Sequence, residues 1–236
     1  MSSEFLSIPQ RFNGPPTSGN GGYSCGIIAN HIAGAARVRL HIPPPLDTPL
    51  ALECNSDGSV ALREDGILVA NGAPCELQLD VPPAPGLDTA RSARARFPCY
   101  EQHVFGTCFV CGPNRPEEDG LQLFPGPVGN WDLLACPWRP TADVLNEDGE
   151  VRPEIVWSAL DCPGYFAAAG ERLLHAVLGE LEGERLAPVP GDQELVVYSW
   201  PLGEVGRKLY AGTAIATGDG VVLARARSTW ILLDKR

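Results

Sequence analysis

The chain has 236 residues, of which 44% are hydrophobic and 20% charged, and its formal net charge is −11 from 29 acidic and 18 basic residues. This balance is typical of a globular protein long enough to bury a sizeable core. The acidic charge and the lack of a basic cluster argue against nucleic acid as a partner. No apolar stretch approaches the length of a membrane span, so no membrane association is expected.

The cysteines are spread along the chain, at positions 25, 54, 75, 99, 108, 111, 136 and 162. The N-terminus lacks the basic and apolar regions of a secretory leader. We therefore expect reduced thiols and a cytoplasmic location.

The first chemically informative stretch is residues 17–30, which read TSGNGGYSCGIIAN. Apolar and small residues recur there at spacings of three and four, which predicts a helix over 22–35. The helix begins directly after Asn20 and Gly21. Two interpretations stay open: the glycines permit a tight turn, or they leave backbone N–H groups bare for a ligand.

Strands are expected after this helix at 37–42, 50–54 and 65–79. The next segment, 79–100, is rich in Pro, Ala and Arg without a clear period, which predicts a linker.

The linker leads to a group of possible soft metal ligands: Cys99, His103, Cys108 and Cys111. Their spacing is not that of a standard zinc finger. A redox pair is a further alternative, although no βαβ pattern surrounds it. The favoured interpretation is inert buried thiols, so we expect no metal and no cofactor.

The second half repeats the order of the first. A helix is expected at about 153–173, followed by strands at 179–189, 194–200 and 219–233. Residues 219–233 (DGVVLARARSTWILL) correspond to 65–79 (DGILVANGAPCELQL), and each opens with the Asp-Gly pair of a hairpin turn. One helix against one antiparallel sheet, present twice, predicts an α+β protein. A single mixed domain with coincidental similarity is the alternative.

Three stretches carry a resemblance to a known family. Residues 108–123 (CFVCGPNRPEEDGLQL) resemble the lead-in of PaaI-like hotdog-fold thioesterases, and 148–168 (DGEVRPEIVWSALDCPGYFAA) resemble their central helix. Residues 19–30 (GNGGYSCGIIAN) resemble the same helix start, with Asn20 where His is usual. The resemblance implies a double hotdog, two tandem repeats that each wrap an antiparallel sheet around one central helix. The repeats would span 1–85 and 104–236, joined by a linker at 86–103.

The resemblance also implies a composite site between the repeats. The first half supplies Asn20 and Gly22 but has Ala-Asn at 29–30 where the acid is usual. The second half supplies Asp161 but has Arg-Pro-Glu at 152–154, and proline has no N–H to donate. Asp161, Asn20 and Gly22 are therefore expected to be catalytic at one working site. A buried acid with a purely structural role is the alternative for Asp161.

Four further residues are candidates for substrate binding. Gly21 and Tyr23 flank the helix start, and Arg207 and Lys208 are candidate anchors for a coenzyme A phosphate. A solvated hairpin pair is the alternative for the two cations.

The implied function is hydrolysis of an acyl thioester, either an acyl-CoA or an acyl-carrier thioester. The alternatives are a non-catalytic acyl- or acyl-CoA-binding hotdog protein and a hotdog hydratase or dehydratase. Assembly into a homo-oligomer is a further expectation, because hotdog sheets commonly associate.

Overall fold

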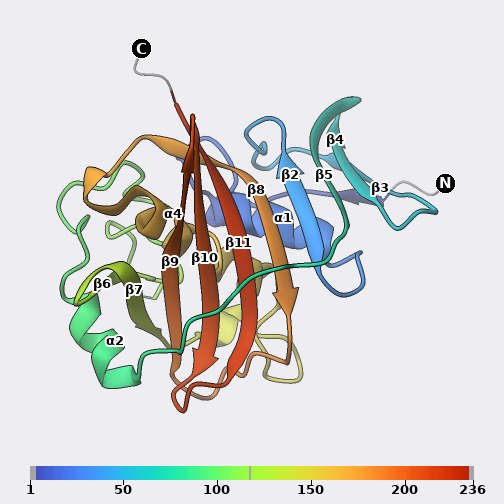
Figure 1. Ribbon diagram of the computed structural model, residues 1–236. Helices are drawn as coiled ribbons and strands as arrows, with labels where there is room; N and C mark the ends of the chain where they lie inside the picture. Colours follow the sequence, from blue (N-terminus) through green and yellow to red (C-terminus); the bar gives the residue numbers. More distant parts are fainter. Residues whose placement is uncertain (1–3, 117, 234–236) are drawn as a thin grey trace.

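The computed structural model describes residues 4–116 and 118–233. Within these ranges an eleven-stranded antiparallel sheet has the order β1-β3-β4-β5-β2-β8-β11-β10-β9-β7-β6 (Figure 1). None of the helices in these ranges has the length and apolar character needed to cross a membrane. The predicted α+β class is confirmed.

The first half contains β1 (Glu4–Leu6), α1 (Gly21–Ala29), β2 (Ala36–Leu40), β3 (Leu50–Cys54), β4 (Val60–Glu64) and β5 (Ile67–Pro74). The second half contains α2 (Leu87–Arg94), β6 (Gly126–Val128), β7 (Asn130–Trp138), α3 (Pro153–Ala159), α4 (Cys162–Ala169), β8 (Ala176–Arg185), β9 (Leu195–Val205), β10 (Lys208–Thr217) and β11 (Val222–Leu232). Short 3₁₀ turns lie at Gln10–Phe12, Ala142–Val144 and Gly170–Arg172.

The strand order is symmetric about the middle of the sheet. Outward from the centre, β2-β5-β4-β3 on one side corresponds to β8-β11-β10-β9 on the other. The central pair β2 and β8 is antiparallel, with Val38 opposite Leu181. Both Asp-Gly pairs lie in hairpin turns, where Gly66 and Gly220 have positive φ angles that suit glycine. The two halves therefore form one continuous sheet.

Helices α1 and α4 lie behind the sheet in the view of Figure 1. Helix α1 packs on β2, β5 and β8, whereas α4 packs on β7, β9, β10 and β11. Helix α1 also packs closely against α3. The helix behind the first half of the sheet therefore contacts a helix of the second half.

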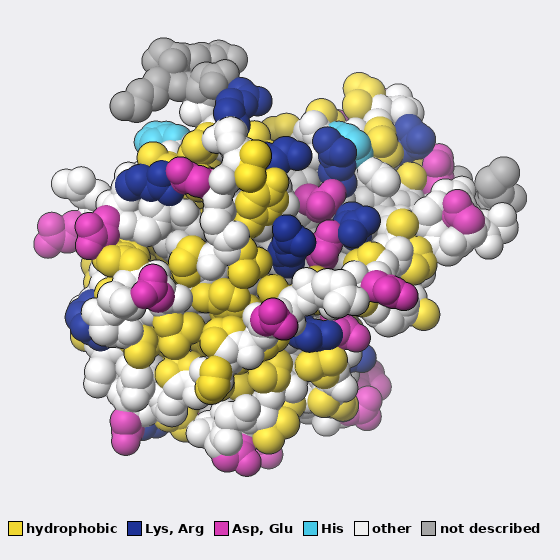
Figure 2. All heavy atoms as spheres, viewed as in Figure 1, with side chains coloured by type: hydrophobic (Ala, Val, Ile, Leu, Met, Phe, Trp, Pro, Cys, Tyr) yellow, Lys and Arg dark blue, Asp and Glu magenta, His cyan; other side chains and the backbone are white. Residues whose placement is uncertain are grey.

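The opposite face of the second half is covered by the predicted linker. Leu79, Val81 and Leu87 pack with Ala90 and Ala93 of α2 over the buried side chains of β9. This second covering layer explains why β9 is buried on successive residues from Leu195 to Trp200 instead of alternating. Figure 2 shows hydrophobic side chains gathered over the middle and lower part of this face, with charged side chains around them.

Two predicted helices differ in extent from the observed ones. The helix expected over 22–35 ends at Ala29, and Gly34 adopts a positive φ before β2 begins. The helix expected at about 153–173 is two helices, α3 and α4, separated at Leu160 and Asp161. Pro163 accounts for the break, because its ring removes a donor and clashes with a continuous helix. The linker segment contains α2, which the sequence did not predict.

The junction between the halves predicts a specific stability effect. Leu181 on β8 is fully buried beside Val38, so Leu181→Ala should lower the free energy of unfolding by about 2–5 kcal/mol through lost contacts and a cavity. Urea unfolding measures this change. Ile67→Ala is the control, since that side chain is 58% exposed and should change stability by less than about 0.5 kcal/mol. Equal effects of the two variants would contradict the assignment of β8 to the core.

Candidate active site

The start of helix α1 is formed by an asparagine cap. Asn20 has an extended backbone, and its Oδ1 accepts the backbone N–H of Tyr23 at 2.9 Å. An N-cap side chain satisfies one of the first N–H groups and leaves others available. One of these, the N–H of Gly22, points out of the helix and donates to a side chain of the second half.

The acceptor is Asp161, at the break between α3 and α4. Its Oδ2 accepts the Gly22 N–H at 2.8 Å and the Asn20 Nδ2 at 3.0 Å. The three residues that the sequence singles out as catalytic candidates therefore lie in direct contact, although about 140 residues separate them in the chain.

The two helices approach so closely because α1 carries glycines on the contacting face. A Cβ on Gly22 would lie 2.5 Å from both the Cβ of Asp161 and the carbonyl oxygen of Trp157. A Cβ on Gly26 would lie 2.6 Å from the Cα of Glu154. Glycine is required at both positions by packing, and the same close approach brings the Gly22 N–H to the carboxylate.

The carboxyl of Asp161 is only 2% exposed. Burial raises its pKa to about 7, against the opposing effect of the hydrogen bonds from Gly22 and Asn20. Its second oxygen, Oδ1, is buried and has no hydrogen-bond partner among the described residues. Both hydrogen bonds to Asp161 are therefore accepted by Oδ2, and Oδ1 accepts none from the described residues.

A cluster of three buried cysteines lies beside this carboxyl. The sulfur atoms of Cys108, Cys111 and Cys162 all lie within 4.8 Å of one another, and Cys162 Sγ is 3.6 Å from Asn20 Nδ2. Hydrogen bonds from the other two thiols hold the pKa of Cys108 well below its usual range. The hydrogen bonds of Cys162 with Cys108 and Cys111 hold the pKa of the Cys162 thiol well above its usual range.

This cluster differs from the four residues considered in the sequence. Cys108 and Cys111 belong to it, but Cys99 and His103 do not. The ring Nδ1 of His103 instead accepts the backbone N–H of Phe105. Cys162 was missed because it lies 51 residues beyond Cys111, and its only sequence signal is its position directly after Asp161.

The remaining candidates are not brought to Asp161. Gly21 packs against Leu178, whose side chain a Cβ would meet at 2.8 Å. Tyr23 is 6% exposed and its ring stacks on Phe12 with centroids 4.0 Å apart. Tyr23 therefore belongs to the packed core, and Gly21 is a half-buried contact of Leu178.

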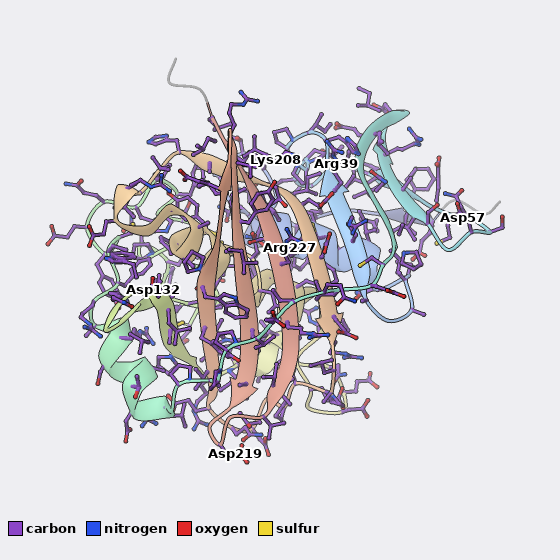
Figure 3. All side chains as sticks on the ribbon, viewed as in Figure 1. Arg39, Asp57, Asp132, Lys208, Asp219 and Arg227 are labelled. Atoms are coloured by element: carbon purple, nitrogen blue, oxygen red, sulfur yellow. The ribbon has the colours of Figure 1, made fainter. Side chains whose placement is uncertain are left out.

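Arg207 and Lys208, where β10 begins, lie near the C-terminal end of α4 and not near its N-terminal end, where Asp161 lies. Lys208 pairs with Ile231 near the end of β11 (Figure 3). The adjoining strand residue Glu204 forms an ion pair with Arg172, which follows the C-terminal end of α4, whereas Asp161 precedes its start.

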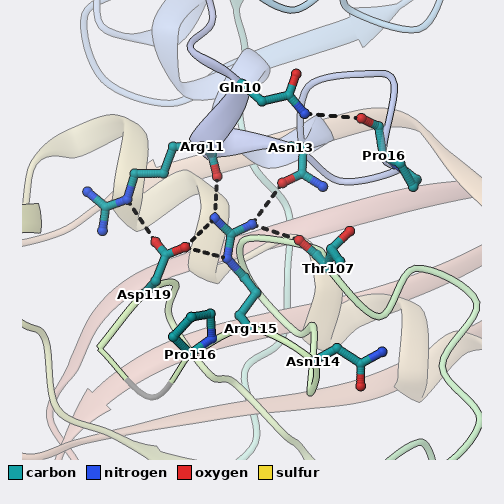
Figure 4. A pocket seen from close by; sticks show the side chains of 9 residues that line it. All are labelled: Gln10, Arg11, Asn13, Pro16, Thr107, Asn114, Arg115, Pro116 and Asp119. Atoms are coloured by element: carbon teal, nitrogen blue, oxygen red, sulfur yellow. Dashed lines mark hydrogen bonds and ion pairs between the residues drawn. The ribbon is translucent and has the colours of Figure 1, made fainter.

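Two of the cavities on the surface of the described residues are lined by residues other than Asp161, Asn20 and Gly22. A cavity of about 380 Å³ is lined by Arg11, Asn13, Thr107, Arg115 and Asp119, among others (Figure 4). A second, of about 510 Å³, lies on the outer face of the sheet beside Trp200.

The guanidinium of Arg115 in the first cavity is fully engaged. Its nitrogens donate to Asp119 twice, to Asn13 Oδ1, and to the backbone oxygens of Thr107 and Arg11. These are all five donors that an arginine has. Arg115 therefore clamps the loop that begins at Thr107 onto the segment before α1, and it has no donor left for an anionic ligand.

Comparison with solved structures places the fold. An acyl-CoA thioesterase II (TesB2) from Mycobacterium marinum is 14% identical with a TM-score of 0.60, over 92% of this chain and 90% of its own. A protein of Novosphingobium aromaticivorans assigned as a thioesterase is 13% identical with a TM-score of 0.67, over 98% and 96%. The TesB protein of Mycobacterium avium subsp. paratuberculosis is 14% identical with a TM-score of 0.55, over 90% and 86%.

The chain has the hotdog fold of these solved thioesterases, so the resemblance seen in its motifs is confirmed for the fold. No model of a protein family matches the sequence, and no curated protein matches it.

The close packing of α1 on α3 predicts that Gly22→Ala lowers the free energy of unfolding by about 1–3 kcal/mol, because backbone atoms that cannot move aside surround the added methyl group. Chemical denaturation measures the change. Gly86→Ala is the matched control: its Cβ would enter open space, and the loss should be at most about 1 kcal/mol from the poorer helix cap. Unfolding of Gly22→Ala at the wild-type midpoint would count against this packing.

Proposed function

We propose that the protein hydrolyses an acyl thioester, an acyl-CoA or an acyl-carrier conjugate, at a composite site made by Asp161, Asn20 and Gly22. The single observation that carries this proposal is the contact of the buried Asp161 carboxyl with the N-terminus of α1. The acyl-CoA thioesterase among the similar structures supports the thioester class.

We propose further that the two halves are hotdog repeats, 1–85 and 104–236, with a linker at 86–103. The symmetric strand order about the β2–β8 pair supports this division. So does the presence of one helical unit behind each half of the sheet.

In the proposed reaction the thioester carbonyl oxygen takes the place of Asp161 Oδ2 at the Gly22 N–H. The N–H then lies at the positive end of the α1 dipole and stabilises the oxyanion that develops on the carbonyl. Asn20 Nδ2 continues to hold the carboxylate in position.

The chemical step uses the second carboxylate oxygen. Asp161 Oδ1 accepts a proton from water as the water oxygen bonds to the carbonyl carbon. The carbon–sulfur bond then breaks, and the leaving sulfur takes the proton from Asp161. The products are a carboxylic acid and a free thiol, so atoms and charge balance without a cofactor.

The burial of Asp161 supports a second candidate, an acyl-thioester-binding protein without turnover. Asp161 is only 2% exposed, so a substrate requires the covering residues to move before it reaches the carboxyl. The two functions separate in one comparison: calorimetric binding of acyl-CoA without thiol release across a range of chain lengths favours the binding protein.

The hydratase alternative has less support. That chemistry needs a histidine beside the acid, and none of the described histidines hydrogen-bonds to Asp161, whose donors are Gly22 and Asn20. His41 is instead bonded to Asn71.

The first test is Asp161→Asn. Removing the base should lower kcat/KM for acyl-CoA hydrolysis by about 10²–10⁴-fold, measured as released thiol across a series of acyl chain lengths. Asp132→Asn is the matched control, since this exposed carboxylate on β7 is hydrogen-bonded to Asn130 and should leave the rate unchanged (Figure 3). Wild-type rates in a folded Asp161→Asn protein would refute the assignment.

A second test separates the two roles of Asn20. In Asn20→Ser the hydroxyl can still cap α1 by accepting the Tyr23 N–H, but the amide donor to Asp161 is lost. A hydrogen bond to a charged group contributes about 1.5–3 kcal/mol, so kcat/KM should fall roughly 10- to 100-fold. Thermal melting checks that the helix start is preserved. An unchanged rate would remove Asn20 from the proposed site.

A further inference from the structure

The Cys-Phe-Val-Cys-Gly turn has no part in the proposed hydrolysis, yet its geometry is tightly constrained. The Gly112 N–H donates to the carbonyl oxygen of Cys108 at 2.9 Å. A Cβ on Gly112 would lie 2.5 Å from the Cys108 nitrogen and 2.6 Å from its oxygen. Only glycine permits this closed turn, which presents both cysteine sulfurs on one side.

A third sulfur arrives from the start of α4. Cys162 Sγ lies 3.7 Å from Cys108 Sγ, and all three sulfurs lie within 4.8 Å of one another. Two thiolates on a tetrahedral zinc ion, with zinc–sulfur bonds of about 2.3 Å, are about 3.8 Å apart. The observed separation of Cys108 Sγ and Cys162 Sγ therefore matches that of two zinc ligands.

A polar side chain from the start of α1 lies beside the cluster. Asn20 Nδ2 lies 3.6 Å from Cys162 Sγ. Such donors to coordinating atoms orient metal ligands and stabilise their negative charge.

We propose that Cys108, Cys111 and Cys162 bind a zinc ion as thiolates, with water in the fourth position. Soft thiolate ligands select zinc among the common divalent ions. No carboxylate or imidazole in residues 4–116 and 118–233 joins the three sulfurs in this cluster, so the protein supplies three ligands. Binding releases the protons of the thiols that are protonated in the free protein.

The ion ties the loop that begins at Thr107 to the start of α4, a connection that spans 54 residues between Cys108 and Cys162. Cys162 follows Asp161 directly, so the ion fixes the backbone that presents the carboxyl. This inference does not depend on the proposed hydrolysis, and its readouts do not measure activity.

The test is metal analysis of the full-length protein, purified with a non-thiol reductant and without chelators. Mass spectrometry of the metal content should find about one zinc per chain. Replacement by Co²⁺ should give the visible bands of a tetrahedral site and a thiolate-to-cobalt charge-transfer band in the near ultraviolet. Removing zinc with a chelator should lower the Tm, and adding zinc should restore it.

Variants identify the ligands. Cys162→Ser and Cys111→Ser should each lose the bound zinc and the thiolate charge-transfer band. Cys136→Ala is the matched control, because this buried cysteine on β7 lies outside the cluster and its removal should leave the zinc content unchanged. If the reduced wild-type protein takes up neither Zn²⁺ nor Co²⁺, or if Cys136→Ala loses the metal as the cluster variants do, the proposal is overturned. Metal uptake by the wild-type protein tests the proposal even if one of the variants fails to fold.

Discussion

The contact on which this molecule depends is the one between the Asp161 carboxyl and the first N–H groups of α1. A buried carboxyl is costly unless donors compensate it, and here Gly22 and Asn20 supply them from the other half of the chain. The contact requires two chain features at once: glycines that let the helices touch, and a proline that ends α3 where Asp161 stands. The β2–β8 pair joins the two halves of the sheet, and the sheet in turn supports the helices that carry these two ends.

The symmetric position in the molecule is built differently. There the cap residue of α3 is Arg152, which makes no side-chain capping bond, and Pro153 follows it without an N–H. The contact across the halves is Asn30 to Glu154, an exposed amide that donates to a carboxylate whose side chain is 14% exposed. The start of α1 thus has donors facing an acid, whereas the start of α3 has a carboxylate facing the amide of Asn30. A symmetric sheet therefore carries an asymmetric pair of helix ends.

Asn20 joins the features that surround the carboxyl. Its Oδ1 caps α1, and its Nδ2 reaches both Asp161 and the sulfur of Cys162. The loop that carries Cys108 is in turn clamped by Arg115 to the segment leading into α1. The helix cap, the acid and the thiol cluster are consequently one connected unit, so a change at any of them is expected to be felt at the others.

Local patterns in the sequence, apolar runs and Asp-Gly turns, predicted the strands that correspond to β2, β3, β5, β8, β9 and β11 and the start of α1, but not β4, β7 or β10. The grouping of Asp161 with Asn20 and Gly22 was implied by the resemblance to hotdog thioesterases. The sequence did not reveal α2, whose short face of Ala90 and Ala93 is explained only by its packing against β6, β7 and β9. The break at Asp161 was readable from Pro163, but the packing role of Gly22 and Gly26 was not, since it depends on a helix about 130 residues away. The proximity of Cys162 to the other two thiols could not be predicted for the same reason. Turns and periodicity depend on neighbouring residues and can be predicted from the sequence, whereas only the tertiary structure decides which distant side chains pack together.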